Sequence, residues 1–334
     1  MSRAKTSAPP DGPPPLARHG PAQSGAARNC PARRGSAPAG LPAGREPHYT
    51  LRVTVHDSQP PENRPRPPWV PNEIDIERPS AARMYDYFLG GSSNFAADRK
   101  LADEYMRVLP DMPVIARAQR GVLHRAVRFM AGQGVDQFLD LGSGMPTVGN
   151  VHEIAQSVNP AACTVYVEVD PVAVAHGRAL LRNGGHTTVV EADLREPARV
   201  LADPAVREML DLSRPVGVLM IAVLHFIGDA DDPVGTVGAY RDAVAPGSYL
   251  AITHATSDYQ PRMARDAERV YQRASHQMHY RSKAEVRALL GGWDLVEPGL
   301  VDMIKWRPDP DSGPDPLGGD VARYSGYAAV GRKP

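Results

Sequence analysis

A short apolar run that ends in a glycine turn constrains the fold of this chain more than any other feature. Residues 135–141 carry an acid near their end, Asp140, and are followed by Gly142-Ser143-Gly144 and then by a helical pattern from about Val148. Because glycine has no Cβ atom, the backbone can turn sharply here and let a ligand approach closely. The order strand, glycine turn, helix predicts a βα unit whose helix points its free N–H groups at a ligand beside the sheet edge.

Two phosphate-binding signatures are incomplete at this turn. A dinucleotide fingerprint needs a third glycine where Thr147 stands, and the Gly-Lys-Ser/Thr ending of a phosphate loop is missing. This disfavours a nicotinamide-dependent reductase. An acid before Gly-x-Gly instead resembles the first motif of class I S-adenosylmethionine-dependent methyltransferases, whose cofactor has no phosphate. An ordinary βα turn without a ligand is the structural alternative.

The composition separates an N-terminal tail from the rest of the chain. Residues 1–71 are rich in Pro, Gly, Ala and Arg and poor in large apolar side chains, so we expect a disordered tail. Lys+Arg and Asp+Glu balance at 38 each, which argues against a protein held to nucleic acid by bulk charge. Without an apolar run that could form a membrane span or a signal peptide, a soluble cytoplasmic protein is expected. The 2 cysteines are too few for a disulfide framework or a cysteine zinc site.

Three helical patterns precede the first strand, within residues 72–134. The first runs over Ser80–Leu89, the second opens at 92–99 and continues to about Val108, and the third covers Pro113–Ala131. Gly90-Gly91 separates the first two helices. We expect these helices to form a cap over the carboxyl edge of the sheet, with the glycines as the hinge of a lid.

Strand and helix patterns then alternate over residues 135–334. Apolar strand segments are expected at 136–141, 164–169, 187–191, 217–223 and 248–253. Helices are expected at 148–157, 171–181, 204–210, 233–245 and 261–274. Two late strands follow, at Trp293–Val296, with an extension to Trp306 left open, and at Ala322–Val330. The pattern predicts an α/β fold with a mostly parallel, seven-stranded sheet covered by helices on both faces.

Acidic residues stand near the ends of three successive strands: Asp140, Glu168 and Asp193. A carboxylate after the second strand can accept hydrogen bonds from two ribose hydroxyls. A carboxylate after the third strand can accept from the amino group of adenine, or simply cap the next helix. We favour Glu168 for the ribose and Asp170 as the cap of the following helix, with Asp170 as the ribose ligand the alternative.

Histidines follow the next two strands. His225 would face the mouth of the cleft, and His254 ends the fifth strand. Functional and structural roles are both open for His225. The candidates for a general base are His225, His254, Tyr85 and Asp86, and a base is needed only if the acceptor must lose a proton. No metal-ligand cluster is evident in the sequence, so no metal is expected.

The segment Arg83-Met84-Tyr85-Asp86-Tyr87-Phe88-Leu89-Gly90-Gly91, with Asn94-Phe95 and Asp98-Arg99, resembles the N-terminal signature of a methyltransferase family. This actinobacterial, S-adenosylmethionine-dependent family was long described as a domain of unknown function. The resemblance continues through 138–147, 165–171, 192–197, 218–232 and 247–258, and covers roughly 72–334. The family usually has aspartate where Glu168 stands and Lys-Asp where Ser92-Ser93 stands, so any role of that pair does not carry over.

The resemblance implies a Rossmann-like class I fold and in-line methyl transfer from S-adenosyl-L-methionine to a small molecule, for instance a secondary metabolite. Together with the strand-end pattern it predicts these cofactor-binding residues: Asp140, Gly142, Ser143, Gly144, Glu168, Asp170, Asp193, Leu194, Val223 and His225. The residues expected at the cap or acceptor site are Arg83, Tyr85, Asn94 and His254.

Two alternatives to a small-molecule methyltransferase stay open. The first is a non-catalytic S-adenosylmethionine-binding sensor or interaction protein, because no general base is clear. The second is a methyltransferase acting on a macromolecule. The target-base motif of amino-methylating DNA enzymes is replaced by Val223-Leu224-His225-Phe226, which makes nucleic acid the less favoured acceptor.

Overall fold

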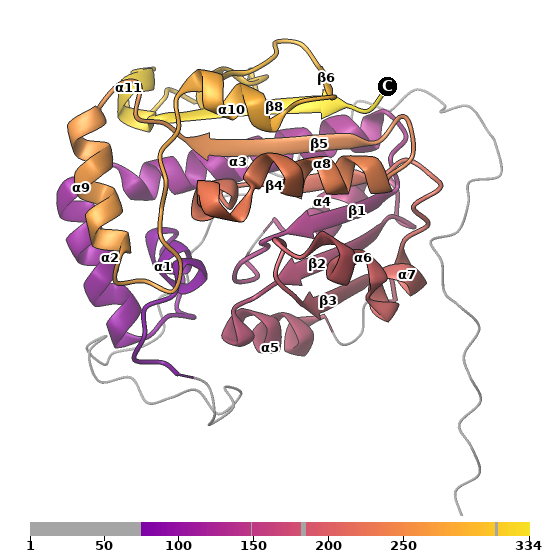
Figure 1. Ribbon diagram of the computed structural model, residues 1–334, viewed down its shortest axis with the longest axis horizontal. Helices are drawn as coiled ribbons and strands as arrows, with labels where there is room; N and C mark the ends of the chain where they lie inside the picture. The colour runs from indigo at the N-terminus through magenta and orange to yellow at the C-terminus, as the bar shows by residue number, and fades with distance from the viewer. Residues whose placement is uncertain (1–74, 148, 182–184, 311–312) are drawn as a thin grey trace, which may run out of the picture.

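The alternation of strands and helices expected from residue 135 onward is present in the computed structural model. The structure describes residues 75–147, 149–181, 185–310 and 313–334, so the tail predicted at 1–71 lies outside the described residues. A twisted sheet occupies the centre, and the helices α1 (Ala81–Phe88), α2 (Ala96–Val108) and α9 (Pro261–Tyr271) lie beyond the ends of its strands (Figure 1). Within the described residues, no helix has both the length and the apolar character that a membrane span needs.

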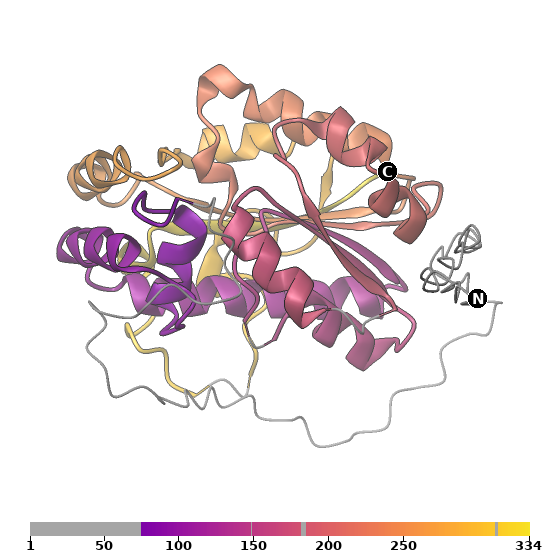
Figure 2. The same cartoon turned by 90° about the horizontal axis from the view of Figure 1, so that it is seen from below.

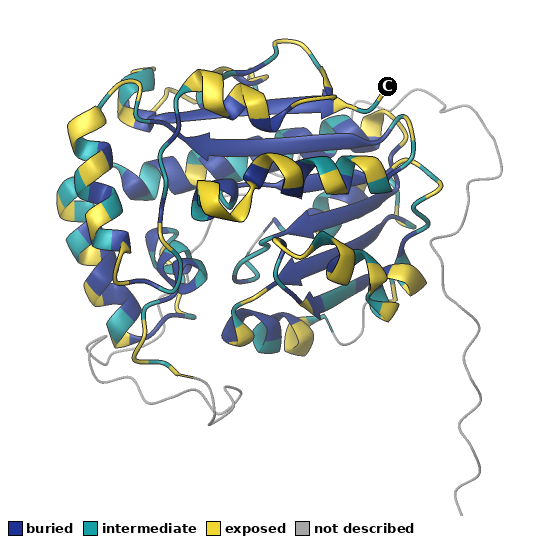
Figure 3. Ribbon diagram, in the orientation of Figure 1, coloured by how far each residue is buried: buried dark blue, intermediate teal, exposed yellow. Residues whose placement is uncertain are grey.

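The sheet follows the strand order β3-β2-β1-β4-β5-β8-β6. Its parallel strands are β1 (Gln137–Leu141), β2 (Cys163–Glu168), β3 (Thr187–Glu191), β4 (Gly217–Met220) and β5 (Tyr249–Ala255). Every residue of β1, β2, β4 and β5 is buried, as Figure 3 shows in dark blue. This burial on both faces explains why these segments read as near-continuous apolar runs.

The last part of the sheet differs from the prediction. The predicted strand Ala322–Val330 begins instead with a short helix, α11 (Val321–Tyr324), which Asp320 caps, before β8 (Gly326–Arg332). The chain turns between them at Ser325, whose φ is +42°. β8 runs antiparallel to β5 and also pairs with β6 (Asp294–Leu295) and β7 (Val301–Asp302), so the sheet has 8 strands rather than the predicted seven.

Helices cover both faces of the sheet, as expected (Figure 2). One apolar cluster joins one face to α3 (Met112–Gly132) and α4 (Val151–Val158). A second cluster joins the other face to α6 (Pro197–Ala202), α7 (Pro204–Met209), α8 (Pro233–Ala243) and α10 (Lys283–Leu289). The helix α5 (Pro171–Leu180) follows β2 directly. The sequence pattern did not predict α6 and α10, which are short and lack a long apolar repeat.

The cap differs from its prediction in the course of α3. α1 and α2 lie beyond the strand ends as expected, but α3 begins there and then runs along the sheet, where it packs against β4 and β5. α9, predicted only as the helix after β5, packs against α2. Apolar residues of α1–α3 and of the sheet form one continuous cluster. Because α1–α3 share this cluster with the sheet, a cap at 72–134 that forms a unit distinct from the sheet domain stays a prediction.

Candidate active site

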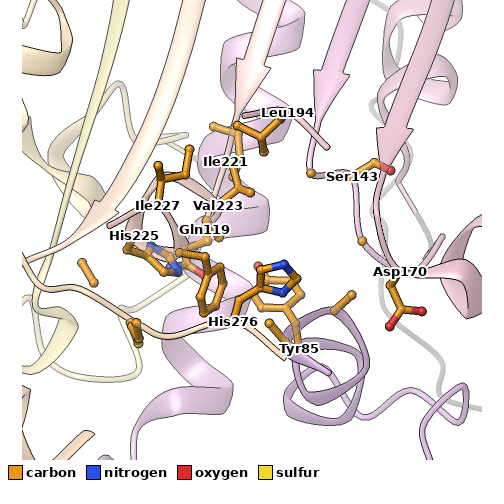
Figure 4. Close-up of a pocket in the computed structure, with 18 of the residues that line it drawn as sticks. Tyr85, Gln119, Ser143, Asp170, Leu194, Ile221, Val223, His225, Ile227 and His276 are labelled. Atoms are coloured by element: carbon orange, nitrogen blue, oxygen red, sulfur yellow. The ribbon is translucent and has the colours of Figure 1, made fainter. Parts of the chain in front are cut away.

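A cavity of about 250 Å³ lies at the carboxyl ends of the parallel strands. Residues that follow β1, β2, β3 and β4 form one side, and α1, α2, α3, α9 and the segment 275–280 form the other. Along the strand ends, Figure 4 shows Ser143 and Asp170 toward one end of the cavity and His225 and Ile227 toward the other. All the residues predicted to bind the cofactor line this cavity: Asp140, Gly142, Ser143, Gly144, Glu168, Asp170, Asp193, Leu194, Val223 and His225.

The glycine turn after β1 brings backbone close to the cavity. The backbone N–H groups of Gly142 and Ser143 both donate to the carbonyl of Val167, at 2.8 and 3.2 Å. Gly142 has φ +72°, and a Cβ atom there would lie 2.3 Å from Cγ2 of Val223. Gly144 has φ +66°, with nothing within 4 Å of a Cβ atom. The two positions need glycine for backbone conformation, and Gly142 also needs it for space.

Glu168, at the end of β2, holds this turn in place. Its Oε2 accepts from the N–H of Gly144 at 2.6 Å, and its Oε1 accepts from the N–H groups of Val169 and Asp170, both at 2.8 Å. Burial raises the pKa of Glu168, while the backbone N–H groups of Asp170, Gly144 and Val169 lower it. Since a carboxylate offers about four lone-pair sites, the three backbone bonds leave acceptor capacity for a ligand hydroxyl.

Asp170 has the capping role that we favoured for it. Its Oδ1 accepts from the N–H groups of Val172 and Ala173, at 2.9 and 3.0 Å, and so caps α5. Its Oδ2 lies 3.9 Å from Nη1 of Arg83. This contact links the cap helix α1 to the strand-end loop that lines the cavity.

Asp140 is a buried carboxyl with only 5% of its surface exposed. Burial raises its pKa to about 7, the Arg120 guanidinium opposes this rise, and the Glu168 carboxylate adds to it. A cationic group placed beside Asp140 would favour its ionised form. The site therefore suits a ligand that carries a positive charge near the glycine turn.

Asp193, after β3, is already paired in the structure. Arg195 donates to both of its carboxylate oxygens, with Nη2 2.6 Å from Oδ2, and also reaches Asp231 at 3.2 Å. Burial raises the pKa of Asp193, but the hydrogen bonds and the charge of Arg195 outweigh this and lower it. Beside it, the backbone carbonyl of Leu194 accepts from the hydroxyl of Tyr240 at 2.9 Å. The sequence analysis missed Arg195 as the partner of Asp193.

His225 lines the cavity from a 3₁₀ turn, η2 (Leu224–Phe226), which follows β4. Its side chain is buried, and its Nδ1 has no hydrogen-bond partner. Burial, followed by the charges of His254, Arg281 and His279, lowers the pKa of His225 far below its usual range. The imidazole is therefore neutral at neutral pH and can accept a hydrogen bond.

Of the predicted cap residues, only Tyr85 lines the cavity. Its hydroxyl donates to the carbonyl of Ala116 at 3.1 Å, and burial raises its pKa. Asp86, a candidate base, instead accepts from the N–H of Ser93 and from Nδ2 of Asn94, both at 2.8 Å. Burial is the main cause that raises the pKa of Asp86. Through these two hydrogen bonds the Asp86 carboxylate holds the loop after α1 in position, and it does not line the cavity.

Arg83 and Asn94 also hold the cap together and do not line the cavity. Arg83 pairs with Asp98 at 3.1 Å and not with Asp86, which lies about one helical turn away. Both partners are buried. Asn94 donates to Asp86 and accepts from Nη1 of Arg99 at 3.1 Å. The geometry therefore does not support a direct role of Arg83 or Asn94 at the acceptor site.

His254 lies behind His225 and outside the cavity lining. Its Nδ1 is 2.8 Å from the carbonyl oxygen of Ala255, and its Nε2 is 3.1 Å from Nη1 of Arg281. Because a guanidinium only donates, Nε2 accepts and Nδ1 carries the hydrogen. Burial lowers the pKa of His254 to about 4. Its place is therefore beside the loop that carries His225, where a base acting on an acceptor would not reach.

Several lining residues were not predicted from the sequence. They come from α2, α3, α9 and the segment after it, and include Tyr105, Gln119, Arg120, Tyr271, His276 and Tyr280. The aromatic residues read as ordinary helix core, and no local motif marks them. Among the described residues, no group of three His, Cys, Asp or Glu side chains is placed to hold a metal ion.

The chemistry of the lining fits S-adenosylmethionine. Its ribose hydroxyls, adenine amino group and methionine ammonium are donors, and the cavity offers the carboxylates of Glu168, Asp193 and Asp140 at successive strand ends. The cofactor also needs backbone to lie close to it without a phosphate cradle, as the positive φ values of Gly142 and Gly144 allow.

Comparison with known proteins gives a family and two closely similar structures. Residues 67–334 match the family described as S-adenosyl methyltransferase. A methyltransferase candidate from Thermobifida fusca YX is 44% identical, with a TM-score of 0.74, over 80% of this chain and 99% of that one. A DUF574 family protein from Streptomyces avermitilis MA-4680 is 40% identical, with a TM-score of 0.74, over 78% of this chain and 100% of that one. A search of curated proteins gives no match.

The family match covers the whole region that the sequence motifs had marked, and the class I methyltransferase fold is confirmed by the strand order. The glycine turn and the three strand-end carboxylates are the parts of this fold that face the cavity. The chain belongs to the S-adenosyl methyltransferase family and is an S-adenosylmethionine-dependent methyltransferase.

Proposed function

We propose that this methyltransferase acts on a small molecule that binds inside the cavity between the strand ends and the cap. The observation that carries the proposal is the two-sided lining of the cavity. One side presents the carboxylates and glycine backbone that suit the cofactor, and the other presents mainly apolar and aromatic side chains of α2, α3 and α9. A pocket that combines apolar walls with a few convergent polar groups is typical of small-ligand sites.

The cofactor would occupy the side formed by the glycine turn and the ends of β2 and β3. In this proposal Glu168 accepts from the ribose, Asp193 and Leu194 contact the adenine, and Asp140 faces the methionine ammonium. Ser143, Gly144 and Val223 contribute close contacts, and Asp170 supports this side by fixing the start of α5. When bound, S-adenosylmethionine supplies a methyl group attached to a sulfonium, which makes that carbon electrophilic.

The contribution of the protein is orientation and exclusion of water. The acceptor atom must lie in line with the bond that breaks, and the apolar cap side chains exclude water from that approach. His225 is the cavity residue best suited to accept a hydrogen bond from the acceptor, because its imidazole is neutral and its Nδ1 has no partner among the described residues. Asp86 and His254 are not proposed as bases, because they lie outside the lining.

A small acceptor is favoured over a macromolecule by the position of the cavity and by charge. The wall opposite the strand ends is made by α1, α2, α3, α9 and the segment 275–280, so the acceptor would bind between these helices and the strand ends. The formal net charge of the whole chain is +0, so no bulk attraction to nucleic acid supports a nucleic-acid acceptor.

The test uses methyl-labelled S-adenosylmethionine and a cell extract separated by size into metabolite and macromolecule fractions. We expect label to enter the metabolite fraction when the purified full-length protein is added. Asp193→Ala, which should weaken cofactor binding without unfolding the protein, serves as the matched control and should reduce this transfer. Label that enters protein or nucleic acid instead would overturn the proposed class of acceptor.

A further inference from the structure

Two buried polar atoms in the cavity lining have no hydrogen-bond partner within the protein. They are Oε1 of Gln119, on α3, and Nδ1 of His225, on η2. Gln119 is 6% exposed and His225 is 4% exposed. Buried polar atoms without a partner destabilise the folded state and are rare in native proteins, so a ligand with donors at these two positions would be favoured. In Figure 4 both lie on the side of the cavity away from Ser143 and Asp170.

An aromatic wall continues from His225 toward the cap. The wall consists of Phe226, Tyr271, Tyr105 and Tyr280, all of which line the cavity. Ring centroids are 4.5 Å apart for His225 and Phe226, 5.5 Å for Phe226 and Tyr271, and 4.9 Å for Tyr271 and Tyr105. The hydroxyls of Tyr105 and Tyr280 lie 2.8 Å apart. These ring contacts are tilted or edge-to-face, and together the four rings give this part of the cavity an aromatic wall that suits an apolar ring of a ligand.

The charged residues of the cavity lining lie outside the aromatic wall. The charged residues that line the cavity come from α3 and from the ends of β1, β2 and β3: Arg120, Asp140, Glu168, Asp170, Asp193 and Arg195. On the aromatic wall, burial raises the pKa of Tyr105, Tyr271 and Tyr280, which keeps their hydroxyls protonated. A charged acceptor placed against this wall would lose its hydration without gaining a partner.

The loop that carries His225 is held rigidly by Arg281. This buried guanidinium donates to the carbonyls of Leu224 and Ile227, at 3.3 and 2.8 Å, and to Asp229 at 2.7 Å. The N–H of His279 donates to the carbonyl of His225 at 2.7 Å. Arg281 is therefore a positioning residue that fixes the imidazole at one point of the cavity, as an enzyme needs for a group that orients a substrate.

We propose that the acceptor is an uncharged, flat aromatic compound that carries two hydrogen-bond donors, one bound by His225 and the other by Gln119. The methylated atom carries the first donor hydrogen, as in a phenol or an N–H heteroaromatic ring. This inference rests on the proposed function and narrows it to a class of acceptor. In the transfer the acceptor lone pair forms the bond to the methyl carbon, and the sulfur–methyl electron pair stays on sulfur. The acceptor hydrogen leaves as a proton to solvent, and His225 accepts the hydrogen bond that orients the acceptor before the transfer.

The test is a ligand-observed NMR screen of the full-length protein saturated with S-adenosylhomocysteine. The library contains equal numbers of four matched kinds of compound: uncharged aromatics with two donors, the same rings with the donors methylated, aromatic carboxylates, and aliphatic amines. We expect the bound compounds to come from the first kind. Methylating their donors should weaken binding by about tenfold for each lost hydrogen bond. Binding that favours the carboxylates, the amines or the donor-free rings, or no binding from any group, would overturn the inference.

Two variants assign the donors to residues. His225→Phe keeps an aromatic ring beside Phe226, and Gln119→Leu keeps the approximate volume, so each should remove most of the preference for donor compounds at saturating S-adenosylhomocysteine. Gln272→Leu, at an exposed position outside the cavity lining, is the matched control and should behave as the unchanged protein. If only one cavity variant folds, that variant still tests its own contact. If a folded variant still prefers compounds with two donors, the hydrogen bond assigned to the replaced residue is wrong.

The outcomes also separate this inference from the proposed function. Label that enters a metabolite as a methyl ester or as a methylated aliphatic amine would preserve the small-molecule function and overturn the aromatic donor class. Label in the macromolecule fraction would overturn the proposed function itself, whatever the screen shows.

Discussion

The carboxylate of Glu168 accepts a hydrogen bond from the backbone N–H of Gly144 at 2.6 Å, and so joins the end of β2 to the glycine turn after β1. The same carboxylate accepts from Val169 and Asp170. One buried side chain therefore fixes two loops that line the cavity. A residue proposed to bind ribose also supports the shape of the site before any ligand arrives.

Replacing this carboxylate should affect both stability and cofactor binding. Glu168→Ala leaves three backbone N–H groups without their acceptor, so we expect the free energy of unfolding to fall by about 1–3 kcal/mol. S-adenosylmethionine affinity should fall by a similar amount, about 1–3 kcal/mol. Asp193→Ala, at a partly exposed side chain, should weaken binding with a smaller loss of stability. Chemical denaturation and calorimetry distinguish the two, and unchanged affinity in both folded variants would refute these cofactor contacts.

Space at the glycine turn can be tested with two alanine substitutions. Gly142→Ala and Gly144→Ala both force a residue with a Cβ atom into positive φ, which costs about 1–2 kcal/mol. Only the first also places that atom 2.3 Å from Val223, so Gly142→Ala should lose more stability and more cofactor affinity. Adding Val223→Ala should recover part of the difference. Equal melting temperatures for the two single variants would show that the turn relaxes without penalty.

The loop after α1 should respond to mutation as a structural element. Asn94→Ala removes a donor to the buried Asp86 carboxylate and an acceptor for Arg99, so we expect a loss of about 1–3 kcal/mol in the free energy of unfolding. Cofactor affinity of the folded fraction should change little, because Asn94 does not line the cavity. Tyr85→Ala, which does line it, should alter ligand binding as well. Thermal melts and calorimetry on both variants measure these effects. If Asn94→Ala lost cofactor affinity but kept its stability, Asn94 would contact the ligand after all.

The stability of the ligand-free protein should depend on the ionisation of Asp140. Burial raises the pKa of this carboxyl to about 7, above its value of about 3.9 in an unfolded chain. Because the folded state binds the proton more tightly, this contribution to stability is fully present below about pH 4 and is lost as the pH rises to about 7. Relative to Asp140→Asn, the unchanged protein should therefore lose up to about 4 kcal/mol across that range. Denaturation midpoints for the two proteins between pH 4 and 8 measure the effect, and parallel curves would place the pKa of Asp140 near its usual value.

Local patterns in the sequence were enough to predict the cofactor side of the site. Apolar runs with a glycine turn identify the βα units, and a parallel sheet brings the carboxyl ends of its strands to one edge. For this reason Asp140, Glu168 and Asp193 line one cavity although they follow three different strands. The capping role of Asp170 was also readable, because a cap depends only on the next few residues.

The cap shows where local patterns fail. Helical spacing places Asp86 about one turn from Arg83, but the structure pairs Arg83 with Asp98 on the next helix. The loop between the two helices decides this pairing, because it brings Asp98 to the buried guanidinium while Asp86 turns to Ser93 and Asn94. Either carboxylate could pair with the charge of Arg83, so composition and spacing do not distinguish the two pairings.

The sequence by itself determined the fold class, the family and the strand-end residues that line the cavity, because each depends on short motifs repeated at strand ends. Only the tertiary structure decided the acceptor side. Tyr105 and Tyr271 meet because α2 and α9 pack together, and Gln119 faces the same cavity as His225 because α3 begins beside the strand ends. Arg281 fixes His225 across a similarly long sequence separation. Such contacts join residues far apart in the chain, and they arise only when whole helices pack against the sheet to bury apolar surface.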